Sequence, residues 1–198
     1  KIKRLNLINS VSGTKSANLI GSKSESGQEN LAIFSSVIHL GSNPALLGFV
    51  LRPDKDVRRH TYDNIITSKS YTINSIHASF IDKAHYTSAK FSVDESEFEK
   101  CKLEAQYLNE FNAPFVKASK LKMALKLQEV VDIKINSCKL IIGSIEHLHV
   151  DQEAIEENGQ VNLQKLDTVA IGGLNSYYAL NQIGHIPYAR TSELPDFD

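Results

Sequence analysis

The sequence predicts a mainly β protein, a barrel of antiparallel strands into which single helices are inserted. Residues 119–130, SKLKMALKLQEV, alternate apolar and polar side chains, and a period of two is typical of a strand with one buried face. Several more apolar segments have strand length, whereas helical signals are few. Strands that dominate a chain with isolated helices favour a barrel over a doubly wound sheet.

The remaining strands are predicted from apolar segments and the turns between them. Residues 17–38 place two apolar segments around the polar, glycine-bounded GSKSESGQ, which indicates a hairpin or a pair of neighbouring antiparallel strands. Residues 44–51, 70–76 and 139–150 add further strands. The last is long enough to bend around a barrel, and Gly143 is its expected kink.

Helices are predicted at three places. Residues 61–68 carry Thr61 as the expected N-cap and Asp63 in the first turn. Residues 93–108 open with Asp94 ahead of further acidic residues, as helices often do. A third, short helix is expected within 151–158.

Length, charge and cysteine content limit the class of protein. A chain of 198 residues fits one domain, 1–198, with a single core. Lys and Arg number 22 against 23 Asp and Glu, so no overall field favours nucleic acid or a membrane surface as partner. Cys101 and Cys138 stand apart, which suits free thiols in a reducing compartment. No segment has the pattern of a signal peptide or a membrane span, and we expect a cytoplasmic protein.

Several well-known catalytic and nucleotide-binding motifs are absent from the sequence. It contains no GxxxxGK[ST], GxGxxG, HExxH or GxSxG segment. His147 and His149 share one face of a predicted strand, but a pair falls short of the three ligands of a catalytic zinc site. We therefore interpret them as surface or interface residues and predict no metal site. Gly172 and Gly173 are interpreted as a turn.

The segment 52–65, RPDKDVRRHTYDNI, is the strongest candidate for an anion site. It brings Arg58, Arg59 and His60 directly before a predicted helix start, where free N–H groups and the helix dipole favour negative charge. The alternative is a solvated loop whose basic residues balance nearby aspartates. Ser35, Ser36, Ser42 and Asn43 lie earlier in the chain, between predicted strands, and supply neutral donors that suit a phosphorylated cofactor.

The order and spacing of several short motifs then indicate a family. The chain contains G-x-x-N-L-A-x-F-S-S from Gly27, G-S-x-P from Gly41, R-x-x-T-Y-x-N-I from Arg58, and YTIN from Tyr71. Further on come HYTSAKFSVDESEFE, CKLIIGSIEHLHV, LDTVAIGGLNSYYAL and YAR. Together these segments resemble the flavin reductase-like family of FMN-binding split barrels, over about residues 17–190.

The resemblance implies a Greek-key, antiparallel split β-barrel that forms a homodimer with one FMN per subunit near the interface. Carried over by position, Asn30 and Ala32 would face the flavin ring, and Ser35 and Ser36 the polar tail. The phosphate would be held by a second set of residues: Arg58, Thr61, Ser42, Asn43 and Asn64. Which of Arg58, Arg59 and His60 contacts it stays open, since the family often has one basic residue there.

In such a protein the cofactor carries the chemistry, so we expect no catalytic triad or general base. The resemblance implies an NAD(P)H-dependent flavin reductase that takes hydride from NADH or NADPH and passes electrons onward, with a partner oxygenase or another acceptor. An alternative is an FMN-binding electron carrier, flavoredoxin-like, without its own nicotinamide site. A third is a split barrel that has lost its cofactor, which so many inward polar groups argue against.

Overall fold

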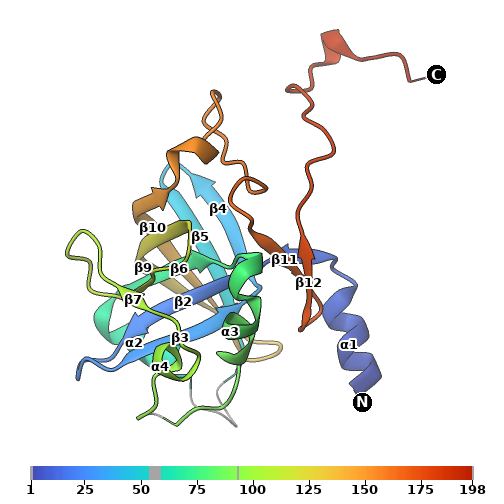
Figure 1. Ribbon diagram of the computed structural model, residues 1–198. Coiled ribbons are helices and arrows are strands. Elements are labelled where there is room, and N and C mark those ends of the chain that lie inside the picture. The colour runs from blue at the N-terminus through green and yellow to red at the C-terminus, as the bar shows by residue number, and fades with distance from the viewer. Residues whose placement is uncertain (1, 54–58, 93, 198) are drawn as a thin grey trace.

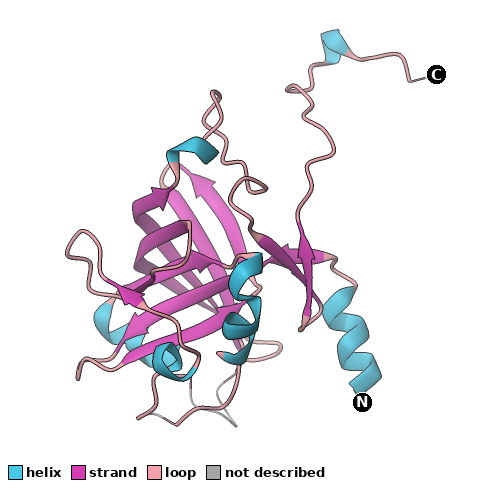
Figure 2. Ribbon diagram, viewed as in Figure 1, coloured by secondary structure: helices cyan, strands magenta, loops and turns pink. Residues whose placement is uncertain are grey.

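A computed structural model describes residues 2–53, 59–92 and 94–197 of the chain. Its centre is a seven-stranded antiparallel sheet with the strand order β3-β2-β6-β9-β10-β5-β4 (Figures 1 and 2). The strands are β2 (Asn18–Lys23), β3 (Glu29–Phe34), β4 (Val37–Ser42), β5 (Ala45–Leu51), β6 (Ser70–Ser75), β9 (Leu121–Ile133) and β10 (Cys138–Val150). The order is linear, so β3 and β4 are edges and the backbone ladder does not close.

The sheet nevertheless curls until its two halves meet. The Ser36 hydroxyl donates to the Val50 carbonyl oxygen at 3.0 Å and accepts from the Val50 N–H at 3.1 Å. Phe34 and Phe49 pack edge to face, with ring centroids 4.9 Å apart. Residues 35 and 36 connect the edge strands β3 and β4, and the Ser36–Val50 bonds continue the β4–β5 ladder beyond its Val37–Phe49 pair. The end of β3 is thereby held against β5.

The smaller elements surround this sheet. The remaining strands form a three-stranded sheet of order β1-β11-β12 and a two-stranded one: β1 (Thr14–Ser16), β11 (Val169–Gly172), β12 (Ser176–Ala179), β7 (Ala105–Gln106) and β8 (Phe115–Val116). The helices are α1 (Ile2–Ser10), α2 (His60–Ser68), α3 (Ile81–Tyr86) and α4 (Glu97–Lys100), with short 3₁₀ turns at Ala78–Phe80, Gln152–Ala154 and Thr191–Glu193. No helix in the described ranges has the length and apolarity to cross a membrane.

Alternation along the strands divides the core into two clusters. Ile20 of β2 faces the interior of the curled sheet, where it joins Phe49, Tyr71 and Ile65 of α2. Its neighbour Leu19 faces the opposite way and joins a second cluster that α3, α4 and β11 cover. Successive side chains of a strand point to opposite faces of the sheet, so both faces of β2 are buried.

A buried polar network joins β8 to this core. Asn74 donates to the Leu19 carbonyl oxygen at 3.1 Å and accepts from the Val116 N–H at 2.9 Å. Thr72 donates to the carbonyl oxygen of Pro114 at 2.6 Å. These hydrogen bonds hold residues 114–116 against β2 and β6. They also give hydrogen-bond partners to the Pro114 carbonyl oxygen and the Val116 N–H, which the short β7–β8 ladder leaves unpaired.

Most of the sequence-based strand predictions are confirmed. The predicted hairpin is β2 and β3, the alternating segment is β9, and β10 carries a register shift between Ile142 and Gly143 where the kink was expected. The turn at Gly172 and Gly173 is present, with Gly173 at a φ of 62°. Cys101 and Cys138 are free thiols.

All three helix predictions are wrong in their bounds. Helix α2 begins at His60 with Arg59 in the N-cap position, so Thr61 is its second residue rather than its cap. The helix expected over 93–108 is only the single turn α4, because Lys102 takes a positive φ of 53° and the chain turns extended into β7. The helix expected within 151–158 is likewise reduced to a 3₁₀ turn.

The two chain ends were not predicted to be distinctive. Helix α1 and the C-terminal arm, which we define as residues 180–197, both project from the three-stranded sheet and away from the barrel (Figure 1). None of the α1 residues is buried, and every residue from 181 to 197 is exposed.

Candidate functional site

Unpaired hydrogen-bond donors gather at the start of α2. Arg59 is the N-cap residue, with φ −107° and ψ 83°, and its side chain makes no capping hydrogen bond to the helix within the described residues. Its carbonyl oxygen accepts from the N–H groups of Tyr62 and Asp63, at 2.8 and 3.2 Å. The N–H groups of His60 and Thr61 have no acceptor within the described residues, as expected for a first helical turn.

The Arg59 side chain adds to this set of donors. One terminal nitrogen, Nη2, donates to the Pro53 carbonyl oxygen at 3.4 Å, a long bond. Its Nε is buried and has no partner among the residues that the structure describes. A buried guanidinium nitrogen without an acceptor is costly, and a helix N-terminus beside it favours an anion. The start of α2 therefore has the donor chemistry of a phosphate site.

A buried polar cluster lies directly behind this helix start. Asn30 of β3 donates to the Thr61 hydroxyl oxygen at 3.0 Å and more weakly to Ser22 at 3.4 Å. Asn64, one turn along α2, also donates to the Ser22 hydroxyl oxygen, at 3.2 Å. All four side chains are buried. The cluster fixes α2 against β2 and β3, and the Thr61 proton has no acceptor within the described part of the chain.

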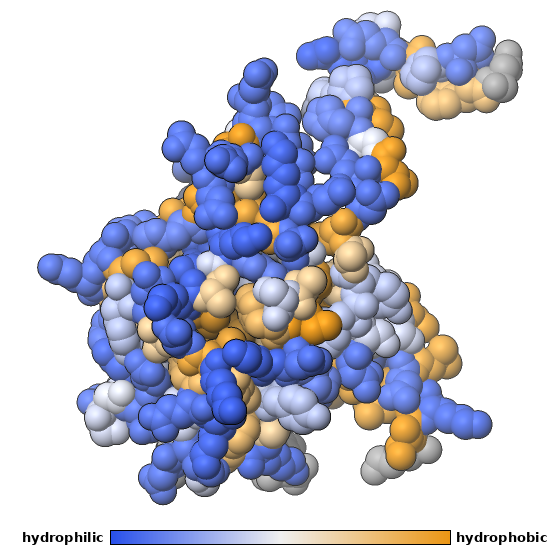
Figure 3. Space-filling view, viewed as in Figure 1, coloured by the Kyte–Doolittle hydropathy of each residue, from blue (hydrophilic) through white to orange (hydrophobic). Residues whose placement is uncertain are grey.

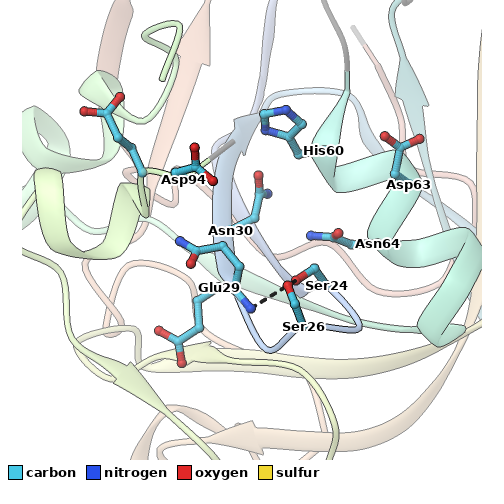
Figure 4. A pocket seen from close by; sticks show the side chains of 10 residues that line it. Ser24, Ser26, Glu29, Asn30, His60, Asp63, Asn64 and Asp94 are labelled. Atoms are coloured by element: carbon cyan, nitrogen blue, oxygen red, sulfur yellow. Dashed lines mark hydrogen bonds between the residues drawn. The ribbon is translucent and has the colours of Figure 1, made fainter. Parts of the chain in front are cut away.

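A cavity of about 220 Å³ borders this cluster and the first turns of α2 (Figure 4). Asn30 enters it from β3, and His60 and Asn64 enter it from α2. Its other lining residues are Ser24, Ser26, Gln28, Glu29, Asp63, Asp94 and Glu95. Four of these are carboxylic acids, so the cavity itself has the wrong charge for a phosphate group. We place the anion site at the helix start rather than in this cavity.

Glu97 supports the edge strand next to the site. Its Oε2 accepts from the Leu31 N–H at 2.9 Å, and its side chain is buried. Burial raises the pKa of the carboxyl group, while the Leu31 hydrogen bond and the charge of His60 act in the opposite direction. We did not predict a role for Glu97 from its residue type, although it lies in the D-x-x-E-F-E segment that contributed to the resemblance.

The other predicted site residues lie in different parts of the fold. Ala32 is half buried on the same face of β3 as Asn30. Ser35 follows β3, and Ser36 is bonded to Val50. Ser42 and Asn43 are exposed in the β4–β5 turn, at the opposite end of β5 from the chain that leads to α2. Arg58 lies outside the described residues.

The structure thus brings part of the predicted site together. Asn30, Thr61 and Asn64 meet in one cluster, and Ser22 is a member that the sequence did not indicate. Ser42 and Asn43 lie away from this cluster, where β4 turns into β5. Each residue's contact with a cofactor stays a prediction.

The histidine pair of β10 is consistent with a structural role. His147 packs edge to face against Phe111 and His149 against Phe115, with centroid separations of 6.2 and 5.5 Å. Among the described residues, no three His, Cys, Asp or Glu side chains are grouped so as to hold a metal ion.

Comparisons with known proteins agree with this fold. Residues 14–166 match the model of the flavin reductase like domain. A solved structure from Shewanella frigidimarina, described as a flavin reductase with a split barrel domain, is 47% identical, with a TM-score of 0.92 over 96% of this chain and 93% of its own.

Two more distant structures share the fold. Nitrilotriacetate monooxygenase component B from Bacillus cereus has 21% identity and a TM-score of 0.84, with 94% of both chains covered. Flavoredoxin of Desulfovibrio vulgaris has 20% identity and a TM-score of 0.77, covering 89% of this chain and 92% of its own. The family match spans more than half of the sequence, and the chain belongs to the flavin reductase-like family.

Proposed function

We propose that this protein binds FMN and acts as an NAD(P)H-dependent flavin reductase. The observation that carries the proposal is a set of donors at the start of α2, in a chain of the flavin reductase-like family. The buried Arg59 Nε and the first N–H groups of the helix have no acceptor among the residues that the structure describes. The 47% identity to a protein described as a flavin reductase supports the same activity.

The residues present fit a flavin mononucleotide. Arg59, Thr61 and the first turn of α2 would hold its phosphate, and Arg58 remains a further candidate for the same contact. The strand β3 carries a small side chain, Ala32, between Asn30 and Phe34 on one face, and the flavin ring would lie along this face. Ser35 and Ser36 follow at the end of that strand as hydroxyl donors for the polar chain.

The protein's part in the chemistry is binding and positioning. When bound, FMN supplies hydride acceptance and electron transfer, which no side chain of the twenty amino acids performs. The buried cluster of Asn30, Thr61 and Asn64 fixes the helix start relative to β3, so phosphate and ring contacts are set by one rigid unit. No residue of this chain is proposed as a general acid or base.

The identity of the partners is part of the proposal. NADH or NADPH is the proposed hydride donor, and a homodimer is the proposed form of the protein. One neighbour in the comparisons is a component of a monooxygenase, which supports a partner oxygenase as acceptor. An electron carrier without a nicotinamide site, as the flavoredoxin neighbour suggests, is the second candidate.

An anaerobic visible spectrum tests the proposal. We expect purified protein supplied with FMN to show a bound-flavin spectrum that bleaches on addition of NADH or NADPH. Bleaching with dithionite alone would instead support the carrier. A protein that leaves the FMN spectrum and fluorescence unchanged would contradict both candidates.

The phosphate contact makes its own prediction. Arg59→Met should weaken FMN binding by roughly 1–3 kcal/mol, the usual loss for a charge-assisted hydrogen bond, as measured by quenching of flavin fluorescence. Lys69→Met, which removes a charge at the opposite end of α2, is the matched control and should leave the affinity unchanged. Equal affinities for the two variants would exclude Arg59 from the site.

The Thr61 hydroxyl can be tested in the same way. Thr61→Val keeps the side-chain shape and should weaken FMN binding by about 1 kcal/mol. Thr67→Val is its control, since Thr67 is exposed on the same helix and donates to the Asp63 carbonyl oxygen. A thermal melt of each variant separates lost affinity from lost stability, because Thr61 also accepts from Asn30.

A further inference from the structure

A second cavity, of about 490 Å³, lies where β9 begins and β10 ends. The ladder between β10 and β5 stops at the Ser144–Leu46 pair, so the last residues of β10 are paired with β9 alone among the described strands. The chain then turns through Gln152–Ala154, and this turn borders the cavity together with the two strands. We call this space the β9–β10 groove. Its lining residues are Ser119, Lys120, Lys122, Leu148, His149, Val150, Asp151, Gln152 and Ile155.

The groove is separate from the candidate flavin site. Lys122 pairs with Asn74 of β6, and Asn74 pairs with Leu19 near the start of β2. Ser22, which belongs to the cluster behind the start of α2, lies three residues further along β2, or roughly 10 Å at the rise of a strand. Two strand spacings separate β2 from β9, or about 10 Å across the sheet. The two cavities share no lining residue in the described part of the chain.

Positive charge in the groove exceeds negative charge. Lys120 and Lys122 stand two positions apart at the start of β9, and Asp151 is the one carboxylic acid among the described lining residues. Asp151 is exposed, and neither lysine forms an ion pair with a carboxylate of the residues that the structure describes. Two ammonium groups beside one solvated carboxylate favour an anionic ligand.

Lys122 has the clearest need for a counter-charge. Its side chain is half-buried, and its ammonium group donates to Gln106 Oε1 at 2.9 Å and to the Lys117 carbonyl oxygen at 3.2 Å. Both acceptors are neutral, and a third N–H remains for a ligand. Burial lowers the pKa of Lys122, while the charge of Asp151 acts in the opposite direction. Charges withdrawn from water are normally paired, and an anion in the groove would supply the partner.

His149 adds to the polar side of the groove. It lies directly opposite Lys122 in the β9–β10 ladder, so the two side chains share one face of the sheet. Burial lowers the pKa of His149, and the charges of Lys122 and His147 lower it further. Its Nε2 is buried and has no hydrogen-bond partner within the described residues. An anion bound to Lys122 would relieve the repulsion that holds this imidazole uncharged.

Apolar side chains form the rest of the groove. Leu148, Val150 and Ile155 line it, and Leu148 and Ile155 keep 53% and 42% of their surface exposed. In Figure 3, apolar side chains lie among hydrophilic ones around the end of β10 and the turn that follows. Small-molecule sites combine such apolar walls with a few placed polar groups, and the volume of the groove is within their usual range. An inorganic anion would leave these walls in water.

We propose that the β9–β10 groove binds a small organic carboxylate with an aromatic or branched apolar body. The carboxylate would bind between Lys120 and Lys122, and the apolar body would lie against Leu148 and Ile155. This site goes beyond the proposed function, because none of its residues belongs to the candidate flavin site.

An NMR titration of the full chain with sodium benzoate tests the site. Flavin and nicotinamide are left out, so a negative result leaves the proposed function untouched. We expect saturable shifts of the backbone amide signals of residues 119–122 and 148–155. Benzamide carries the same body without the charge, and inorganic phosphate carries charge without the body; each should bind at least about 10-fold more weakly than benzoate. Signals that do not saturate in these two segments, or equal affinity for either comparison compound, would overturn the proposal.

Matched lysine variants locate the charge. Lys122→Met keeps most of the aliphatic stem and should weaken benzoate binding by about 10-fold or more. Lys126→Met is the control, since Lys126 is exposed further along the same strand and should not affect the affinity. Lys120→Met is a second test should Lys122→Met fold poorly, and the amide spectrum of each variant reports its folding. Benzoate affinities equal to that of the Lys126→Met control would exclude the lysines from the site.

Discussion

Gly21→Ala is expected to destabilise the fold by about 3 kcal/mol or more, since overpacking of a rigid core is among the costly substitutions. A methyl group at Gly21 would lie 2.6 Å from the Thr72 hydroxyl oxygen and closer still to the Pro114 carbonyl oxygen. The Thr72 hydroxyl group already donates a hydrogen bond to the Pro114 oxygen, and that oxygen is a backbone atom. Neither can move away without breaking the attachment of β8 to β2 and β6.

Chemical denaturation of matched variants measures this effect. Gly184→Ala makes the same substitution in the C-terminal arm, where a methyl group meets nothing within 4 Å. It should change the free energy of unfolding by a few tenths of a kcal/mol at most. If Gly21→Ala unfolded at the same urea concentration as Gly184→Ala, the close approach of residues 113–116 to β2 would be disproved.

Acidification is the second condition with a large expected effect. His77 is buried, and burial together with the charge of Lys120 lowers its pKa to about 4; Asp167 and Asp151 oppose this, and Lys122 adds to it. Its Nε2 accepts from the Lys120 N–H at 2.9 Å, which requires an unprotonated nitrogen. In the unfolded chain the pKa returns to the ordinary 6.5.

The direction of the pH dependence follows from these two values. A depressed folded-state pKa stabilises the protein above pH 6.5, and this contribution is lost as the pH falls through about 4. The loss amounts to roughly 3 kcal/mol. Between pH 7 and 4, the unfolding free energy of the wild type should therefore fall more steeply with decreasing pH than that of His77→Gln. The difference in slope should correspond to the uptake of about one additional proton on unfolding.

The comparison needs a control because other groups titrate in the same range. His39→Gln, on the exposed face of β4, should leave the slope of the wild type unchanged. His77→Gln keeps a carbonyl oxygen that can accept from Lys120, so its slope can be read even if its absolute stability is lower. Parallel curves for His77→Gln and the wild type would rule out His77 as the acid-sensitive group.

The strands were predictable because their pattern is local. Alternation in β9 and the apolar stretch of β10 each follow from the residues of one segment, and the glycine at the β10 kink is a local signal as well. Helix bounds were less predictable. Thr61 has the residue type of an N-cap, but its hydroxyl group accepts a tertiary hydrogen bond from Asn30, and the N-cap lies two positions earlier, at Arg59.

The site was predictable only where the family pattern covered it. The resemblance assigned Asn30 to the flavin ring and Thr61 and Asn64 to the phosphate, and in the structure these three side chains lie in one cluster. Ser22 and Glu97 act through contacts with residues far along the chain, at sequence separations of 42 and 66. The ends of the chain were not predicted at all, and the apolar side chains that they carry, such as Ile2 and Ile183, are exposed in the structure.

The contact between Ser36 and Val50 lies where the chain passes from one edge strand of the sheet to the other. Ser36 stands directly before the Val37–Phe49 pair of the β4–β5 ladder, so its hydroxyl group continues that ladder by one position. One side chain thereby serves both the N–H and the carbonyl oxygen of Val50. Because residues 35 and 36 connect β3 to β4, a substitution at this serine would act on both edges of the sheet at once.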